Sequence, residues 1–279
     1  MSYRLKVNWL RVAGFLLLGL VLLAIAFPAY WIVLTAIKPP TLIYSPQPAL
    51  WTSQPSLEAV RDLFARFPFL TWMRNSLWVS ALNTIVAVVV GSLAAYSLSR
   101  LRYPGRQYLS GLFFFVYLIP ASLLFVPLFV ILNDFGLLNS LWGLTWVYLT
   151  FTVPFCTWIL KAYFANIPAD LEEAALVDGA TRLQALYHVL LPMAAPGIAA
   201  AAIFAFTLSW NEFLYAYTFI RDIDKLTLAP GLTNMLFGDV FQWGQIMSAA
   251  VLMSLPTLVL YFVAQRYVVA GLTAGAVKG

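Results

Sequence analysis

Long apolar segments alternate with short polar ones along the whole chain. Several apolar runs exceed the roughly 20 residues that a helix needs to cross a bilayer, whereas outer-membrane strands would give alternating segments of about ten residues. The pattern therefore predicts an all-α integral membrane protein. Six transmembrane helices are expected, near 12–35, 76–98, 109–132, 141–164, 196–219 and 245–267.

The composition agrees with a membrane protein and limits its chemistry. Hydrophobic residues make up 62% of the chain and charged residues 10%, against about 25% charged in soluble domains. The net charge of +5 is spread out, so the concentrated basic face of a nucleic-acid-binding protein is not expected. Cys156 lies in an apolar segment and is interpreted as a small buried residue. His188 lies in a polar loop without neighbouring cysteine or histidine, so no metal site is expected.

The first apolar run resembles a secretory signal, because Arg4, Lys6 and Arg11 precede it. A cleavable signal has an apolar core of about 7–15 residues. Here the run continues to about residue 37, which favours an uncleaved first transmembrane helix.

Basic residues in the short polar segments predict the orientation. Arg100, Arg102 and Arg106 follow the second expected helix, whereas the short loop 133–140 carries Asp134 and no basic residue. Lysine and arginine favour the cytoplasmic side. With six helices, both termini and the polar loop around Glu173 are then cytoplasmic.

Two longer segments fall on the opposite side. Residues 36–75 are rich in proline and tryptophan, and 57–67 within them fit a short amphipathic helix at the membrane surface. Residues 220–244 carry several charges. Each segment is either a solvated loop or a contact for an external partner, and the sequence pattern is compatible with both.

The loop around Glu173 is a charged island between apolar segments. Asp170 fits a helix N-cap, and Glu173 three residues later fits a capping box. These residues predict a short helix over 171–177.

A turn and a second helix should follow. Gly179 suits a C-terminal cap with a left-handed backbone, and Thr181 with Gln184 forms another capping box before a helix that ends ahead of Pro192. Such a hairpin either docks on a soluble partner or only caps neighbouring transmembrane helices. Physical reasoning from the residues leaves both open.

A longer motif resembles the EAA loop of binding-protein-dependent ABC transporter permeases. That pattern is Glu-Ala-Ala, three residues, Gly, nine residues, then Ile-x-Leu-Pro. The chain matches it with Glu173, Ala174, Ala175, Gly179, Val189, Leu191 and Pro192, where valine replaces isoleucine. Segments 100–105, 209–213 and 265–279 are similar to the carbohydrate branch, of the MalG type, and the resemblance runs from about residue 71 to the end.

The resemblance implies the transmembrane domain of a type I ABC importer. Residues 1–70 would form the first helix and outer loop, 71–267 the core with the coupling loop 165–193, and 268–279 a cytoplasmic tail. Residues expected to couple to an ATPase are Glu172, Glu173, Ala174, Ala175, Asp178, Gly179, Leu191 and Pro192. The tail 273–279 is either a disordered end or a second ATPase contact.

The resemblance also implies the partners. They are two ATP-binding cassette ATPase subunits, a second homologous permease in a heterodimer, an extracytoplasmic solute-binding protein and a sugar. The chain has no Gly-x-x-x-x-Gly-Lys-[Ser/Thr] phosphate loop. ATP and magnesium would thus be bound by the partner ATPase, and this chain would be a non-catalytic, multi-pass subunit of the plasma (inner) membrane without a cofactor of its own.

Polar residues inside the expected helices are candidates for the transport path. Glu212 is the one acid placed within a helix, and intramembrane charges usually face a cavity or a partner. A structural or gating role is favoured for Glu212, and a hydrogen bond between helices for Asn83. The candidates for pore lining or gating are Asn83, Tyr117, Ser209, Trp210, Asn211 and Glu212, with Tyr148 and Trp158 as further aromatic residues.

Other functions compete with a sugar permease. A permease for another solute would share the loop. A secondary transporter often shows repeated halves and several intramembrane acids, and neither is apparent here. An intramembrane protease would need paired aspartates or a serine–histidine pair in the membrane, but every Asp and the one His lie in expected loops.

Overall fold

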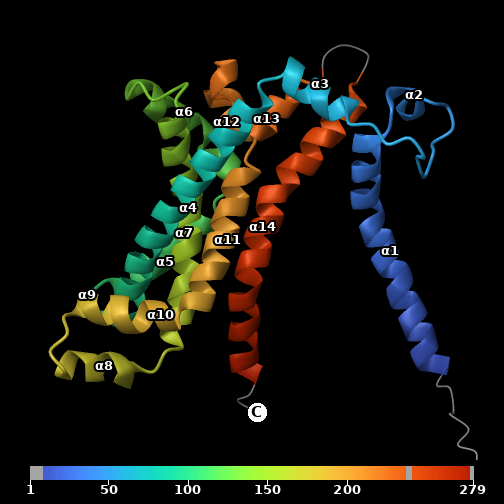
Figure 1. Ribbon diagram of the computed structural model, residues 1–279. Coiled ribbons are helices and arrows are strands. Elements are labelled where there is room, and N and C mark those ends of the chain that lie inside the picture. Colours follow the sequence, from blue (N-terminus) through green and yellow to red (C-terminus); the bar gives the residue numbers. More distant parts are fainter. Residues whose placement is uncertain (1–8, 237–240, 277–279) are drawn as a thin grey trace, which may run out of the picture. The chain divides into compact units, whose positions relative to one another are not determined.

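The computed structural model describes residues 9–236 and 241–276, and every regular element within these ranges is a helix. Figure 1 shows the helices in chain order. They form two compact units, one of residues up to 67 with 235–254, the other of 68–234 with the residues from 255 onward. The prediction of an all-α fold is confirmed.

Four helices of the described chain are long and apolar enough to cross a membrane. They are α1 (Trp9–Ile37), α4 (Phe69–Arg100), α7 (Leu141–Ala165) and α14 (Trp243–Ala276). Two bent helix pairs raise the number to six if each pair is one span. Four of the six expected spans are therefore single helices, and cleavage of the first remains untested.

The third expected span, 109–132, is not one straight helix. It is divided into α5 (Arg106–Leu118), the 3-10 turn η1 (Ala121–Leu124) and α6 (Phe125–Asp134). The helical directions before and after the break differ by 93°. Pro120 explains the break, because the residue before a proline is pushed into extended backbone, and Ile119 has φ −69° and ψ 122°.

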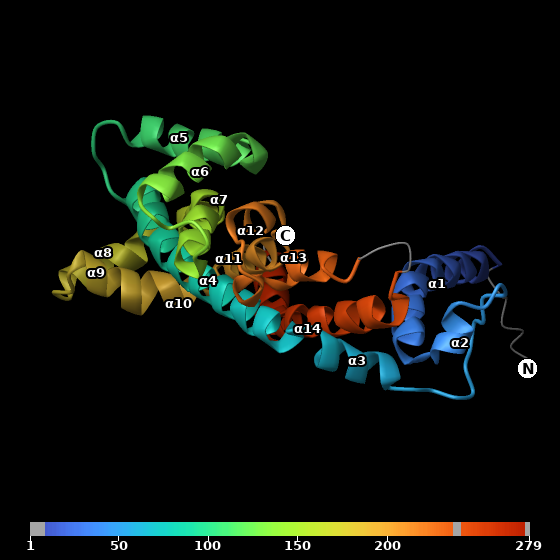
Figure 2. The same cartoon turned by 90° about the horizontal axis from the view of Figure 1, so that it is seen from above.

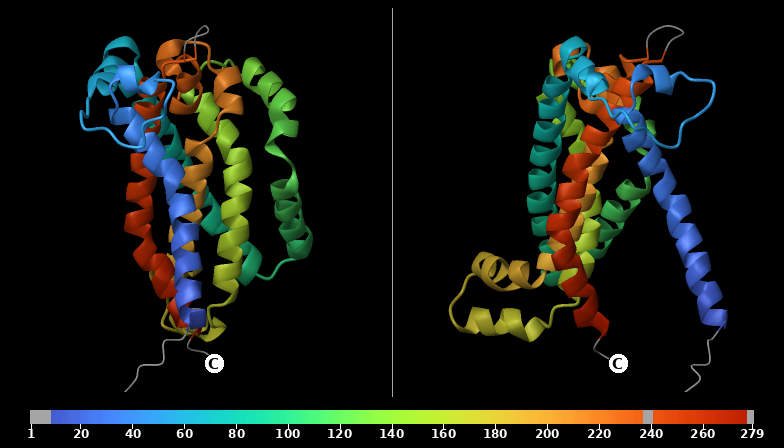
Figure 3. Two further views of the ribbon diagram at one scale, coloured as in Figure 1. Left: turned by 90° about the vertical axis from the view of Figure 1, so that its right-hand side faces the viewer. Right: turned by 45° about the vertical axis from the view of Figure 1, so that its right-hand side comes forward.

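The core of the larger unit is built from α4, α7 and α11 (Ala195–Trp210), which lie side by side in Figures 1 and 3. Small residues allow their backbones to approach closely. A Cβ atom on Gly91 of α4 would stand 2.8 Å from the Cβ of Cys156 on α7. The predicted burial of Cys156 is confirmed, since the residue has no exposed surface.

The smaller unit contains α1, α2 (Pro40–Ile43), α3 (Glu58–Arg66) and the first turns of α14. The predicted helix at 57–67 is present as α3, with Leu63 fully buried. Gln245 on α14 donates a hydrogen bond of 3.4 Å to Asp62. The location of α3 at a membrane surface remains a prediction.

Part of segment 220–244 is anchored to the larger unit. The Asn139 side-chain oxygen accepts hydrogen bonds of 3.0 Å from the backbone N–H groups of Arg221 and Asp222, and its amide donates to the Asp222 carboxylate at 2.8 Å. Lys225, 2.9 Å away, and Asn139 lower the pKa of the Asp222 carboxyl. Residues 237–240 lie outside the described chain, and an external partner for this segment remains a prediction.

Candidate coupling loop and membrane pathway

The loop singled out in the sequence is a helical hairpin at one end of the larger unit. Its first arm is α8 (Ala169–Val177), and its second arm runs from α9 (Arg182–Ala185) through α10 (Leu191–Met193). The two arms lie side by side in Figures 1 and 2. The second arm meets α11 at 80°, so the hairpin crosses the end of the helix bundle.

The start of α8 differs from the prediction. Asp170 does not cap the helix, because α8 begins at Ala169 and Pro168 occupies the N-cap position without a side-chain hydrogen bond. Proline is suited to a helix start since it has no N–H to satisfy and a fixed φ. Asp170 and Glu172 instead lie in the first turn, where acidic side chains favour the positive end of the helix dipole.

The turn between the arms agrees with the prediction. Gly179 has φ +90°, in the left-handed region that favours glycine. The Ala180 N–H donates to the Ala175 carbonyl at 3.0 Å, and the Gly179 N–H donates to the Leu176 carbonyl at 3.1 Å. This pair of bonds is the Schellman motif, which satisfies the last carbonyls of α8.

The second arm begins as predicted but continues further. The Thr181 hydroxyl accepts from the Gln184 N–H at 3.3 Å, and the Gln184 side chain accepts from the Thr181 N–H at 2.8 Å, which completes the capping box. The expected stop ahead of Pro192 is wrong, because helical structure runs through it to Met193. A π-helical turn, η2 (Leu186–Leu190), precedes Pro192. This wider turn lets the helix accommodate a residue that lacks an N–H.

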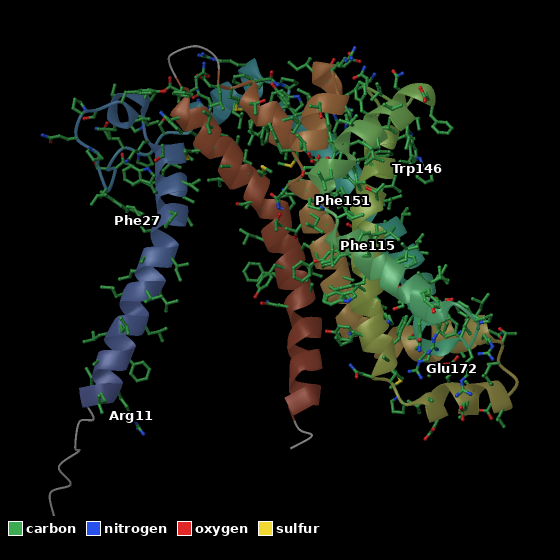
Figure 4. All side chains as sticks on the ribbon, turned by 180° about the vertical axis from the view of Figure 1, so that it is seen from behind. Arg11, Phe27, Phe115, Trp146, Phe151 and Glu172 are labelled. Atoms are coloured by element: carbon green, nitrogen blue, oxygen red, sulfur yellow. The ribbon has the colours of Figure 1, made fainter. Side chains whose placement is uncertain are left out.

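The Glu172 side chain is buried against the end of α4. Its carboxylate accepts a hydrogen bond of 2.7 Å from the Tyr96 hydroxyl of α4 and lies 3.9 Å from the Arg100 Nε. The side chains of Glu172 and Arg100 are both nine-tenths buried. Figure 4 labels Glu172 between α8 and the helix ends that α8 crosses. Arg100 also donates to the Phe164 carbonyl at the end of α7 and to the Ile167 carbonyl in the segment that follows.

The contacts that Glu172 makes with Tyr96 and Arg100 were not predicted from the sequence. Tyr96 and Arg100 are four residues apart on α4, so they lie on one helix face. That spacing is the one local signal for the pair, and it does not indicate which residue they contact.

The other faces of the hairpin are open. Glu173, Ala174, Asp178, Gly179 and Pro192 are exposed, while Ala175 and Leu191 are partly buried. Among the apolar residues, Val177 is 86% exposed, Leu183 67% and Tyr187 68%. Exposed apolar side chains beside acidic ones are typical of a protein-interaction surface.

Glu212 lies at a break between helices and not within one. The helix expected over 196–219 consists of α11, which ends at Trp210, and α12 (Leu214–Phe219). The Glu212 carboxylate accepts hydrogen bonds from the N–H groups of Tyr215 at 3.0 Å and Ala216 at 3.1 Å. The Tyr148 hydroxyl of α7 donates to it at 2.8 Å. The carboxylate therefore supplies acceptors for the exposed donors of the broken backbone.

A hollow of about 530 Å³ opens beside this carboxylate. Tyr117, Phe151, Glu212 and Tyr215 contribute to its lining together with the bend at 118–121. Figure 4 labels Phe151 among the helices of this unit. The hollow thus combines aromatic faces with one acidic group.

The remaining polar candidates lie in helix packing. Asn83 is fully buried, donates to the Thr145 carbonyl at 3.3 Å and accepts from the Ser209 hydroxyl at 2.8 Å. These contacts join α4, α7 and α11, as expected for a hydrogen bond between helices. Trp210 is buried beside them, whereas Asn211 is exposed.

The family model described as "Binding-protein-dependent transport system inner membrane component" matches residues 87–274. The chain belongs to this family. It is a multi-pass permease subunit of the inner membrane.

Curated relatives match this permease over nearly its full length. The inner membrane ABC transporter permease protein YcjP of Escherichia coli is 36% identical over 271 residues, covering 96% of this chain and 97% of the relative. The diacetylchitobiose uptake system permease protein DasC of Streptomyces coelicolor is 34% identical, covering 92% and 93%. Both names describe permeases of transport systems.

The fold of the permease matches a solved importer. A chain from the crystal structure of a bacterial ABC transporter that imports the acidic polysaccharide alginate aligns with a TM-score of 0.81. The two chains are 22% identical, and the match covers 96% of this permease and 99% of the other chain. The type I importer fold expected from the EAA loop is therefore confirmed.

Proposed function

We propose that this permease forms half of the membrane pore of an ATP-driven carbohydrate importer. The observation that carries the proposal is the rigidly capped hairpin 165–193, which presents exposed apolar and acidic residues at one end of the bundle. Family membership supplies the transport role. The sugar substrate is supported by the diacetylchitobiose permease and the alginate importer among the similar proteins.

Coupling to ATP hydrolysis would use the open face of the hairpin. Val177 and Leu183 would enter an apolar groove on a separate ATPase, and Glu173 and Asp178 would meet its basic rim. Because Glu172 and Arg100 join α8 to α4 and α7, movement of the docked ATPase would be transmitted to the long helices. Rigid-body motion of this kind is the usual basis of alternating access.

The complete importer would contain other chains. We propose two ATPase subunits on the side of the hairpin, a second homologous permease, and a solute-binding protein on the opposite side. In this arrangement both termini of the permease are cytoplasmic, as the basic residues after α4 indicate. ATP and magnesium would be held by the ATPases.

The sugar would pass the hollow beside Glu212. Tyr117 and Phe151 offer aromatic faces, and the carboxylate can accept hydrogen bonds from hydroxyl groups. Asn83, Ser209 and Trp210 would hold the surrounding helices in place without touching the sugar.

The first test is purification of the tagged permease from its native membrane in mild detergent, with mass spectrometry of every co-purifying chain. An ATPase, a second permease and a sugar-type binding protein are the expected result, and the ligand of that binding protein then identifies the sugar. Binding of an amino acid or polyamine by that protein would exclude the carbohydrate assignment. Transport by the permease alone, without an ATPase, would exclude the coupling role.

A matched pair of variants tests the docking face. Val177→Arg places a charge on an exposed apolar position of the hairpin, and Ile223→Arg does the same on an exposed position in the anchored outer segment. The first variant should lose the ATPase during purification, and the second should retain it. Equal retention in both would contradict docking through the hairpin.

A further inference from the structure

A hollow of about 550 Å³ is lined by the hairpin 165–193 and the neighbouring end of the bundle. Of its lining residues, the proposed ATPase contact uses Glu173, and the arginines of the hollow other than Arg100 have no role in the proposed transport function. Its lining comes from the end of α4, the segment between α4 and α5, the start of α5, α8 and the start of α9. All of these elements belong to the larger unit.

Positive charge dominates this hollow. Four arginines line it (Arg100, Arg102, Arg106 and Arg182), against the two acidic residues Glu172 and Glu173. Arg100 and Glu172 already pair with each other, so three arginines face a single carboxylate. Within the described chain, none of those three arginines forms an ion pair within 4.0 Å. Arg106 uses part of its guanidinium to donate to the Leu101 carbonyl at 2.9 Å.

A second hollow of about 270 Å³ shares two of these arginines. Arg102 and Arg106 line both hollows, and Tyr108 is part of the lining of the second. Tyr108 is 87% exposed, and Leu112 and Phe115 further along α5 are also exposed. Tyrosine at the start of an apolar helix is typical of the membrane–water interface.

This arrangement matches the two parts of an acidic phospholipid. Guanidinium groups bind phosphate oxygens through paired N–H donors, and basic pockets beside membrane helices bind anionic headgroups. The exposed apolar side chains of α5 would lie along the acyl chains.

We infer that the hollow binds the phosphate of an anionic phospholipid headgroup, held by Arg102, Arg106 and Arg182. A lipid held there would contact α5, α8 and α9 together and would brace the hairpin against the bundle. The inference depends on the membrane location of the chain and not on its substrate. The lipid site can therefore be disproved while the proposed transport function holds, and the transport function can be disproved while the lipid site holds.

Native mass spectrometry of the purified full-length permease, with whatever subunits accompany it, tests the inference. The protein is exchanged into mixed micelles with equal amounts of phosphatidylglycerol and phosphatidylcholine. The wild-type protein should retain phosphatidylglycerol preferentially. Arg102→Gln should lower that retention roughly fivefold, and Arg102→Gln with Arg106→Gln by on the order of 25-fold, since each basic residue near a membrane surface contributes a factor of this size.

A charge-matched control separates the pocket from general attraction. Arg74→Gln with Arg221→Gln removes the same charge from exposed positions outside the hollow and should leave retention unchanged. Equal loss in the control, or no preference for phosphatidylglycerol in the wild-type protein, would overturn the inference. If the double variant does not fold, the single variant Arg102→Gln, which changes an exposed position, is compared with the wild-type protein in its place.

Two further arms distinguish other sources of the anion. Inorganic phosphate at roughly tenfold the lipid concentration should not displace phosphatidylglycerol, because it lacks the acyl chains that contact α5. Displacement by phosphate would assign the hollow to a soluble anion. Loss of the ATPase from the double variant with unchanged lipid retention would assign the arginines to a protein contact, and either result overturns the lipid site.

Discussion

The Tyr96 hydroxyl of α4 donates a hydrogen bond of 2.7 Å to the Glu172 carboxylate of α8. This bond joins a residue near the end of a long apolar helix to the hairpin 165–193, 76 positions away in the sequence. Arg100, one turn beyond Tyr96, lies 3.9 Å from the same carboxylate. Glu172 thus ties the hairpin to the bundle through polar contacts, beside the apolar packing of Leu186 and Leu190.

Tyr96→Phe should loosen this attachment. Removal of one donor from a buried carboxylate costs about 1–3 kcal/mol, so we expect a lower unfolding midpoint in detergent and weaker stimulation of the ATPase by the permease. Tyr217→Phe, which removes the hydroxyl of an exposed tyrosine, is the control and should change neither quantity. Normal coupling in Tyr96→Phe would show that the anchor is dispensable.

Gly179→Ala should strain the turn of the hairpin. A left-handed backbone costs a residue with a Cβ about 1 kcal/mol or more, and no neighbouring atom lies within 4 Å of that position, so the effect is conformational and not steric. ATPase stimulation in reconstituted vesicles is the measurement. Gly136→Ala introduces the same strain at φ +66° in another turn with equally open surroundings. If both variants behave alike, the geometry of Gly179 has no special part in coupling.

A double-mutant cycle should reveal the bond between Tyr148 and Glu212. Tyr148→Phe removes the hydroxyl that donates the hydrogen bond, and Glu212→Gln replaces the carboxylate that accepts it by an amide. Their effects on the free energy of unfolding should deviate from additivity by about 0.5–3 kcal/mol, the range for residues in contact. The cycle of Tyr148→Phe with Glu173→Gln, an exposed carboxylate of the hairpin, should be additive. Additivity in both cycles would contradict the contact.

Gly91→Val should push α4 away from α7. A Cβ at this position would stand 2.8 Å from the Cβ of Cys156 and 3.2 Å from the Thr157 backbone nitrogen, so both helices would have to shift. Overpacking of this kind costs about 1–3 kcal/mol. Gly111→Val on α5 has open space around it and serves as the control. Thermal unfolding of both purified variants is the measurement, and equal midpoints would argue against close packing at Gly91.

The features that the sequence predicted well are those with a local physical cause. The turn at Gly179 and the capping box of Thr181 and Gln184 depend on bonds between residues a few positions apart. The membrane helices α1, α4, α7 and α14 follow from apolar length alone. The prediction of Asp170 as an N-cap is wrong, because Pro168 takes the N-cap position and α8 begins at Ala169.

The features that were missed depend on distant neighbours. The apolar run 196–219 has no proline at the position where α11 ends, and the break becomes stable because Glu212 satisfies the freed N–H groups with support from Tyr148 on α7. The bend after α5 had a local signal in Pro120, yet Pro154 lies inside the continuous helix α7. A proline alone therefore does not predict where a helix of this chain breaks.

Cys156 is the one cysteine of the sequence, and its side chain is enclosed where α7 meets Gly91 of α4. A thiol in this position is closed to bulky maleimide reagents while the protein is folded. A cysteine introduced at Tyr187, which is exposed and is not among the residues proposed to enter the ATPase, would then be the one reactive thiol of the permease. One substitution therefore suffices to attach a spin label or fluorophore that follows the hairpin 165–193 through a transport cycle.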